Sequence, residues 1–450
     1  MTAAELVRSR EAEELRRRID AKDAVVGVVG LGYVGLPLSL AFAEQGFHVL
    51  GFDVDPIKVE ALTRGESYIS HLDGSRVREA VSGGVLSATG DFERLSEPDA
   101  ILICVPTPLT RHREPDMRYV EQTIEQIGTR LRPGQLIVLE STTYPGTTEE
   151  LVRPALEASG LVPGRDFFLA FSPERENPGD PEHTTTTTPK VVGGADVVSG
   201  DLAEALYARI APRVVRVSSV RVAEATKLTE NVFRAVNIAL VNELKLIYER
   251  MGIDVWEVLD AAATKPFGFM RFDPGPGWGG HCIPVDPYYL SWKAREHGKS
   301  SHFIELAGEI NTGMPDHVVS RVIEALNARG RPASGSRVLI LGLAYKPDVA
   351  DDRESPSYHL MDRLAERGAE VAYHDPHVPV IPPTREHSAW AGTPSVTWDR
   401  ETISGFDVVV IATRHSAVDY RELAEWARCI VDTRNAMADV DVPPGKLLKA

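Results

Sequence analysis

The chain has 450 residues, of which 43% are hydrophobic and 25% are charged, as in a soluble globular protein of two or three domains. Its net charge of −16 at pH 7 argues against nucleic acid as a partner, and no apolar run approaches the ~20 residues of a membrane span. Three cysteines are too few for a disulfide framework, and the charged start lacks the apolar segment of a signal peptide, so we expect a cytoplasmic protein.

The first predicted strand, residues 25–29, leads into the motif Gly-x-Gly-x-x-Gly at Gly30, Gly32 and Gly35. The first two glycines permit a tight turn and bring backbone N–H groups close to a pyrophosphate, while the third lets a helix pack closely on the strand. A helical stretch and a second strand, residues 48–52, follow. This order predicts a dinucleotide-binding Rossmann fold.

Asp53 ends the second strand, about 20 residues beyond the glycine loop. An acidic side chain at this place accepts hydrogen bonds from the ribose hydroxyls of adenosine, and it would repel the 2′-phosphate of NADP. We therefore expect NAD as the cofactor. The nearby cation Lys58 leaves the preference over NADP open.

Further apolar runs alternate with helical stretches to about residue 215, which predicts a parallel sheet covered by helices. These runs cover residues 101–105, 136–139, 167–171 and 214–217. Glu174 follows the third of them, at the place where open α/β sheets bind ligands. An ordinary charged loop residue would give the same pattern.

Residues 223–251 contain no proline or glycine, and their apolar residues recur at helical spacing. They predict one long helix that leads into an all-helical middle section. Lys227 and Asn231 lie four residues apart and share one face of this helix, although by themselves they fit a solvated surface better than a site. The section offers more apolar surface than one layer of helices covers, so we expect a homodimer built there.

Cys282 lies in the segment Gly-Trp-Gly-Gly-His-Cys-Ile-Pro-Val-Asp at residues 277–286. A glycine-rich loop can present a thiol to a substrate, so both a nucleophile and a packed structural thiol remain open. Asp286 could cap the helix that follows, and for His281 we prefer a structural role over that of a general base. The other histidines show no metal-ligand spacing, and we expect no metal site.

A second series of predicted strands begins beyond residue 330. It comprises residues 338–342, 370–373, 408–411 and 430–431. Gly342 and Asp375 follow the first two strands, but the second and third glycines of the dinucleotide motif are missing. This section therefore predicts an incomplete Rossmann-like fold that holds a nucleotide but not a dinucleotide.

The predicted fold is α/β, with two doubly wound Rossmann-like domains joined by a long helix and a central all-helical domain. We place the NAD-binding Rossmann domain at residues 1–215, the central helical domain at 216–320, and the second Rossmann-like domain at 321–450.

Taken together, these motifs resemble the UDP-glucose/UDP-mannuronate dehydrogenase family, the nucleotide-sugar 6-dehydrogenases, over nearly the whole chain. Besides the Cys282 loop and the pair Lys227 and Asn231, five segments carry the resemblance. They are Gly-Leu-Gly-Tyr-Val-Gly-Leu-Pro at 30–37, Val-Pro-Thr-Pro at 105–108, Glu-Ser-Thr-Thr-Tyr-Pro-Gly-Thr at 140–147, Ser-Pro-Glu-Arg-Glu at 172–176 and Leu-Ala-Tyr-Lys-Pro-Asp-Val-Ala-Asp-Asp-Arg-Glu-Ser at 343–355.

The resemblance implies a four-electron oxidation of the sugar's CH2OH group to a carboxylate, with two NAD per turnover. Cys282 would capture the intermediate aldehyde as a thiohemiacetal, and loss of a second hydride would leave a thioester for water to hydrolyse. The implied catalytic residues are the nucleophile Cys282, the oxyanion stabilisers Lys227 and Asn231, and the water-positioning groups Asp286, Thr142 and Glu174.

The resemblance makes residues 216–320 the dimerisation and catalytic domain and residues 321–450 the nucleotide-sugar-binding domain. It also implies binding residues. Those for NAD are Gly30, Gly32, Tyr33, Val34, Gly35, Asp53, Lys58, Pro106, Thr107, Thr142 and Arg353. Those for the nucleotide-sugar substrate are Glu174, Lys227, Asn231, Gly279, Tyr345, Lys346 and Arg434.

Two positions depart from the UDP-glucose enzymes of the family. His281 stands where those enzymes have serine before the nucleophile, and Pro178 replaces the second acid of their acidic loop. Both variants resemble the branch that oxidises UDP-N-acetylhexosamines, especially UDP-N-acetylglucosamine. Glucose as the sugar, and thymidine in place of uridine, remain open.

Two other classes of protein compete with this interpretation. A 3-hydroxyacid or 6-phosphogluconate-type NAD dehydrogenase also joins a Rossmann domain to helices and uses a Lys and Asn one turn apart, but it needs no thiol. A catalytically inactive NAD-binding regulator is the second rival, and the presence of Cys282 and Lys227 argues against it.

Overall fold

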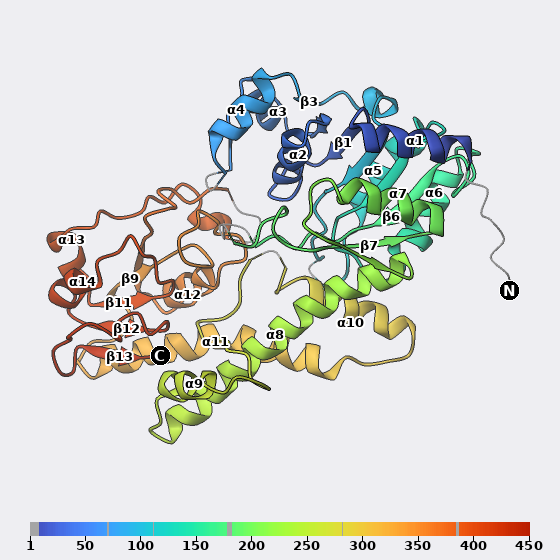
Figure 1. The fold of residues 1–450 in the computed structure, drawn as a ribbon. Coiled ribbons are helices and arrows are strands. Elements are labelled where there is room, and N and C mark those ends of the chain that lie inside the picture. Colours follow the sequence, from blue (N-terminus) through green and yellow to red (C-terminus); the bar gives the residue numbers. More distant parts are fainter. Residues whose placement is uncertain (1–8, 70–71, 111, 178–181, 281, 384–386) are drawn as a thin grey trace. The chain divides into compact units, whose positions relative to one another are not determined.

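The computed structural model describes residues 9–69, 72–110, 112–177, 182–280, 282–383 and 387–450. The chain divides into two units, each with its own sheet (Figure 1). Unit 1 comprises Met1–Glu230 and Tyr288–Lys299, and unit 2 comprises Asn231–Pro287 and Ser300–Ala450. The long central helix passes from one unit to the other between Glu230 and Asn231.

The sheet of unit 1 has eight strands in the order β3-β2-β1-β4-β5-β6-β7-β8. The first six follow the strand order of dinucleotide-binding Rossmann folds and are parallel. The strands β3 and β7 are not among those predicted, and β7 pairs antiparallel with β6. The strands are β1 Val25–Val29, β2 His48–Phe52, β3 Leu86–Thr89, β4 Ala100–Ile103, β5 Leu136–Leu139, β6 Phe168–Phe171, β7 Lys190–Gly194 and β8 Val214–Val217.

Helices cover this sheet because its central strands are apolar on both faces. One face packs alternate residues of β1, Val26 and Val28, into a core shared with α1, α2 and α7. The helical elements of this part are α1 Arg10–Ala21, α2 Gly35–Glu44, α3 Pro56–Thr63, α4 Gly74–Ser82, the 3₁₀ turn η1 Phe92–Ser96, α5 Arg118–Gly128, the π-helical turn η2 Thr148–Val152, α6 Arg153–Glu157 and α7 Val197–Tyr207.

The long helix α8 runs from Val220 to Arg250, close to the predicted range. In unit 2 its residue Val241 packs against Val255, Trp256 and Leu259 of α9. The other helices of the middle section are α9 Val255–Ala263, α10 Asp286–Glu296 and α11 His302–Asn327. Among the described residues, no helix combines the length and apolar character that crossing a membrane requires.

The sheet of unit 2 is parallel throughout, with strand order β10-β9-β11-β12-β13. Counted along the chain, this is the order 2-1-3-4-5 of mononucleotide-binding doubly wound folds. Alternate residues of β9 enter two cores, Val338 and Ile340 on the side of α11 and α12, and Leu339 and Leu341 on the side of α13 and α14. The elements are β9 Arg337–Leu341, α12 Pro356–Ala365, β10 Glu370–His374, η3 Ser388–Trp390, α13 Arg400–Ser404, β11 Val408–Ile411, α14 Tyr420–Trp426, β12 Ile430–Asp432 and β13 Leu447–Lys449.

Candidate active site

The glycine loop after β1 has the shape that a bound pyrophosphate needs. Gly30 has φ +93°, and a Cβ atom there would lie 2.7 Å from the carbonyl oxygen of Cys104. A Cβ on Gly35, the first residue of α2, would lie 1.9 Å from the carbonyl oxygen of Gly30. A Cβ on Gly32 would meet nothing within 4 Å. Two glycines thus let the backbone close on itself, and the third borders open space that a dinucleotide can fill.

The carboxylate of Asp53 is tied to this loop. Its Oδ2 atom accepts hydrogen bonds from the backbone N–H of Leu31, at 2.9 Å, and from Nζ of Lys58, at 3.0 Å. The acid therefore lies beside the glycine turn, where a ribose would need it. Lys58 on α3 forms an ion pair with Asp53.

The other predicted cofactor residues of unit 1 follow neighbouring strands. Tyr33 and Val34 lie in the glycine turn, and Pro106 and Thr107 follow β4, which pairs with β1. The carbonyl oxygen of Thr107 accepts a hydrogen bond of 3.0 Å from the hydroxyl of Tyr289. Thr142 follows β5 and is half-buried. Because these strands are parallel, their carboxyl ends meet at one edge of the sheet, where Rossmann folds bind ligands.

Glu174 follows β6 at the same edge and is buried. Its Oε1 atom accepts hydrogen bonds from the backbone N–H groups of Arg175 and Glu176, each 2.6 Å long, and its Oε2 atom lies 3.0 Å from Nζ of Lys190. Burial opposes the charge, but Lys190 and these hydrogen bonds lower the pKa of Glu174 below its ordinary value. Nζ of Lys227 donates a hydrogen bond of 2.6 Å to the backbone carbonyl of Glu174.

In unit 2 the structure brings Asn231, Cys282 and Asp286 together. The side chain of Asn231 on α8 donates to the carboxylate of Asp286, the first residue of α10, and both are buried. The backbone N–H of Asp286 donates to the carbonyl oxygen of Cys282 over 2.8 Å. Cys282 is a half-buried thiol. His281 and Pro178 lie outside the described residues.

The glycine-rich loop before Cys282 packs against the segment that follows β9. A Cβ on Gly279 would lie 2.8 Å from Cβ of Tyr345, and a Cβ on Gly280 would lie 2.8 Å from the ring of Tyr345. The backbone N–H of Gly280 donates to the carbonyl oxygen of Arg353 over 3.2 Å. Glycine is needed here because the two chain segments are in direct contact.

Lys346 and Arg434, the predicted nucleotide-sugar contacts, follow β9 and β12. The Nζ atom of Lys346 lies 5.9 Å from the ring centroid of Tyr345. The guanidinium of Arg434 lies against Gly275, because a Cβ atom on that glycine would be 2.2 Å from Nη1 of the arginine. The Nε atom of Arg434 donates a hydrogen bond to the carbonyl oxygen of Ala412. Desolvation lowers the pKa of Arg434 to about 10. A desolvated guanidinium of this kind suits an anionic ligand such as a phosphate.

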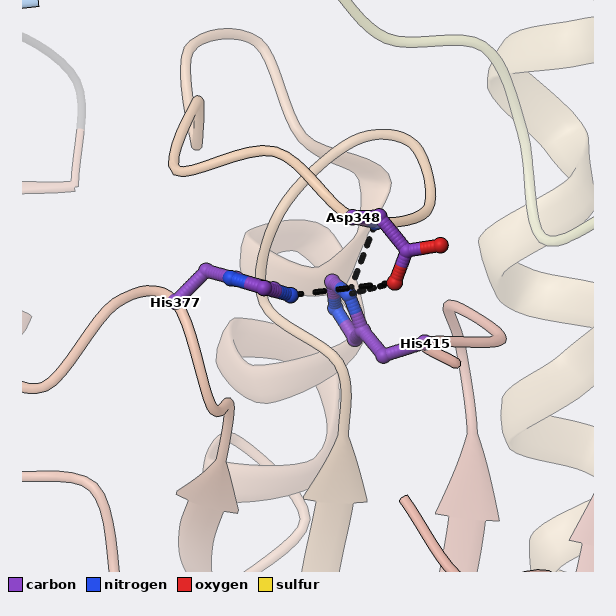
Figure 2. Close-up of side chains that lie close together, drawn as sticks. All are labelled: Asp348, His377 and His415. Atoms are coloured by element: carbon purple, nitrogen blue, oxygen red, sulfur yellow. Dashed lines mark hydrogen bonds and ion pairs between the residues drawn. The ribbon is translucent and has the colours of Figure 1, made fainter. Parts of the chain in front are cut away.

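A cluster that the sequence did not predict lies beside this segment (Figure 2). His415 is fully buried. Its Nδ1 atom accepts a hydrogen bond from the backbone N–H of Asp348, and its Nε2 atom lies 3.1 Å from the carboxylate of Asp375. The Nε2 atom of His377 lies 3.7 Å from Oδ1 of Asp348. Although Asp348, His377 and His415 are close enough to suggest a metal site, both nitrogens of His415 already have protein partners. The cluster therefore fastens the loop that carries Tyr345 and Lys346.

Comparison with known families gives three matches in chain order. Residues 24–211 match the NAD binding domain of the UDP-glucose/GDP-mannose dehydrogenase family, residues 221–313 match its central domain, and residues 339–439 match its UDP binding domain.

Individual relatives match over most of their length. A UDP-N-acetyl-D-glucosamine 6-dehydrogenase of Pseudomonas aeruginosa is 39% identical over 88% of this chain and 91% of its own. The solved structure of a UDP-D-ManNAc dehydrogenase from Pyrococcus horikoshii is 33% identical, with a TM-score of 0.84 over 93% of this chain and 97% of its own. The structure of a UDP-glucose dehydrogenase from Pyrobaculum islandicum is 29% identical, with a TM-score of 0.80 over 94% of this chain and 98% of its own.

Proposed function

Since the chain belongs to the UDP-glucose/GDP-mannose dehydrogenase family and is an NAD-dependent nucleotide-sugar dehydrogenase, we propose that it oxidises a UDP-N-acetylhexosamine, with UDP-N-acetylglucosamine as the first candidate. Relatives named for UDP-N-acetylglucosamine and UDP-N-acetylmannosamine, at 39% and 33% identity, support an acetylated sugar. The observation that carries the chemistry is the arrangement around Cys282. The backbone carbonyl of Cys282 accepts the N–H of Asp286, and the carboxylate of Asp286 accepts a hydrogen bond from the side chain of Asn231. Glucose is the alternative sugar.

In the first oxidation the C6 hydroxyl of the sugar loses a proton and C6 loses a hydride, which gives an aldehyde. When bound, NAD supplies the hydride acceptor for this oxidation and for the second. We propose that Lys227 and Asn231 stabilise the developing alkoxide, because both present buried N–H donors one helical turn apart on α8.

The second oxidation requires a covalent intermediate. The thiol of Cys282 adds to the aldehyde carbon, so that a C–S bond forms and the former carbonyl oxygen takes a proton. The thiohemiacetal then loses a proton and a hydride and becomes a thioester. Water adds to the thioester carbonyl, the C–S bond breaks, and the thiol and the sugar carboxylate are released. One water is consumed and two NADH form for each sugar.

For hydrolysis of the thioester we propose that Glu174, Thr142 and Asp286 hold the attacking water. Glu174 is suited to this role because its pKa is lowered, which keeps the carboxylate available as an acceptor. We further propose that Lys346 and Arg434 bind the diphosphate of the nucleotide, which the family's UDP binding domain and the cationic character of both side chains support.

Incubation with NAD and a panel of UDP-N-acetylglucosamine, UDP-N-acetylmannosamine, UDP-glucose and dTDP-glucose tests this function. We expect two NADH for each sugar consumed, and a product that has gained one oxygen and lost two hydrogens. One NADH per sugar would place the chain with the single-step hydroxyacid dehydrogenases. Preferred turnover of UDP-glucose would overturn the acetylated substrate and leave the thioester mechanism intact.

We also propose that the protein is a homodimer that assembles through α8 and works in the cytoplasm. Phe233, Leu240 and Ile247 are spaced by seven residues on α8, and each residue is 47–48% exposed. Heptad spacing places the three on one face of the helix, as in paired helices. Contact with a second copy of the chain would remove this apolar stripe from water.

A further inference from the structure

A lysine that the catalytic mechanism does not use lies between two buried carboxylates of unit 1. Lys190, the first residue of β7, is 2% exposed, and its Nζ lies 2.7 Å from Glu140 and 3.0 Å from Glu174. Strands β6 and β7 pair antiparallel, with Phe171 opposite Gly193. Continued beyond the strand, this register places Lys190 opposite Glu174. The lysine and the acid are thus aligned by the sheet itself.

One ammonium group serves two carboxylates, and their other partners differ. Glu174 also accepts two backbone N–H groups at 2.6 Å, from Arg175 and Glu176. Glu140 has as its other donor the neutral hydroxyl of Tyr207. Hydrogen bonds to a charged carboxylate favour its ionised form, so the environment favours charge on Glu174 over charge on Glu140.

The pKa directions agree with this asymmetry. Burial raises the pKa of Glu140 to about 7, whereas the pKa of Glu174 is lowered despite its burial. Burial disfavours the charge on Lys190, but the two carboxylates reverse this and raise its pKa. Two neighbouring acids whose pKa values are driven apart are typical of sites where one must stay ionised. Other titratable or charged groups interact with this trio: Cys104, Glu176, Tyr207 and Lys227.

We propose that Lys190 is a positioning residue that holds the carboxylate of Glu174 in place and ionised, and that Glu140 is the carboxylate that takes up a proton first. The inference rests on the proposed role of Glu174 in positioning the hydrolytic water. Lys190 is buried and acts only through Glu174. Glu140 competes with Glu174 for Lys190, because without this second acid the lysine would pair with Glu174 alone.

Two single substitutions should move the pH profile of kcat in opposite directions. Lys190→Met removes the cation, so we expect Glu174 to hold its proton to higher pH and kcat at pH 7 to fall at least tenfold, with recovery toward pH 9. Glu140→Gln is nearly isosteric and removes the competing carboxylate, so we expect the acidic limb of the kcat profile to move to lower pH. KM for NAD should stay within twofold in both. If Lys190 had only a structural role, both variants would lose stability and activity, but their kcat profiles would not shift in opposite directions along the pH axis.

The ionisation of Glu174 can be followed without turnover, by ¹³C NMR of the full chain labelled at the glutamate carboxyl carbon. Glu174→Gln and Glu140→Gln assign the two resonances. We expect the Glu174 resonance to titrate at higher pH in Lys190→Met and at lower pH in Glu140→Gln. An unchanged Glu174 titration in Lys190→Met overturns the inference, even if the enzyme oxidises UDP-sugars. Normal titration shifts without UDP-sugar oxidation would sink the proposed function alone.

If Lys190→Met does not fold, Glu140→Gln still decides, because it preserves the shape of the buried side chain. A Glu174 titration that is unchanged or moves to higher pH in Glu140→Gln would contradict competition for Lys190.

Discussion

The side chain of Lys227 donates a hydrogen bond of 2.6 Å to the backbone carbonyl of Glu174. The lysine lies on α8, and the glutamate follows β6, so this bond fixes the amine against the acidic loop. An ammonium group has three N–H donors, and one bond to a carbonyl leaves two for a substrate oxygen. In the proposed mechanism this bond orients Lys227 before the oxyanion forms, which is the condition for effective electrostatic stabilisation.

Lys227→Met should therefore lower kcat by about 10²–10³, the usual cost of losing one donor to an oxyanion. We expect both oxidations to slow, because each develops charge on the same oxygen. Single-turnover NADH formation, started from the sugar alcohol or from an aldehyde analogue, measures the two halves separately. Thr229→Ala, at an exposed position on α8, is the control and should leave both rates unchanged. A defect in only one half would assign Lys227 a narrower role.

Cys282→Ser tests the covalent step. The serine variant should still bind NAD and the UDP-sugar, but it should stall at, or leak slowly from, an oxygen-linked adduct, because an alkoxide is a poorer leaving group than a thiolate. Intact-protein mass spectrometry and the NADH yield per sugar measure this. Cys429→Ser, at a buried position in the core of unit 2, controls for general loss of a thiol. Near-normal turnover by Cys282→Ser would rule out the thioester.

Gly32→Ala should separate cofactor binding from folding. A Cβ on Gly32 meets no protein atom within 4 Å, so the variant should unfold at the wild-type temperature while its new methyl group occupies the space that we propose for NAD. Gly74→Ala is the matched control, because a Cβ there makes only an ordinary contact, 3.9 Å from Ser67. Calorimetric titration with NAD should show weakened binding for Gly32→Ala alone. Wild-type affinity in that variant would remove Gly32 from the cofactor site.

The sequence was sufficient where short segments carry the information. The glycine motif at 30–35, the acid at the end of β2 and the long helix α8 are each specified by residues close in the chain, and the structure contains the predicted turn, strand and helix. The family resemblance, built on such segments, is confirmed by the family matches over residues 24–211, 221–313 and 339–439. The domain boundaries and the roles of the site residues remain predictions.

Partners that depend on tertiary contacts could not be predicted. Lys190 and Glu140 are separated by 50 residues, and only the sheet register brings them together. A lysine at the start of an apolar strand was the available signal, because a buried cation needs a counter-charge. The links from His415 to Asp348 and Asp375 likewise join the ends of three different strands. The charged start of the chain forms α1, in which Ala12, Leu15 and Ile19 are buried because these apolar residues recur at helical spacing.

Leu240→Glu should dissociate the proposed dimer. Leu240 is the middle residue of the exposed stripe on α8, and a carboxylate there would be desolvated by a facing helix. Light scattering at micromolar concentration should give the mass of two chains for the wild type and of one chain for the variant. Glu366→Gln, which removes an exposed charge just beyond the end of α12, is the control. A wild-type protein that is monomeric under these conditions would contradict the dimer.

Lys245 on α8 is 5% exposed, and its Nζ atom has no hydrogen-bond partner within the described part of the chain. Burial lowers its pKa to about 8, although Glu249 and Asp432 act in the opposite direction. The folded state therefore disfavours the proton that the unfolded chain binds up to its ordinary pKa near 10.5. Below pH 8 this cost is present in full, and stability should rise as the pH increases from 8 to about 10.5.

Lys245→Met should accordingly stabilise the protein at pH 7, by up to about 3 kcal/mol, since each pKa unit corresponds to about 1.4 kcal/mol. The gain should shrink as the pH rises above 8, because the wild-type amine then folds uncharged. Urea unfolding at pH 7, 8 and 9.5 measures this, with Lys299→Met at an exposed position as the control. A variant that is less stable than the wild type at pH 7 would show that the ammonium group is held by favourable interactions that outweigh its desolvation.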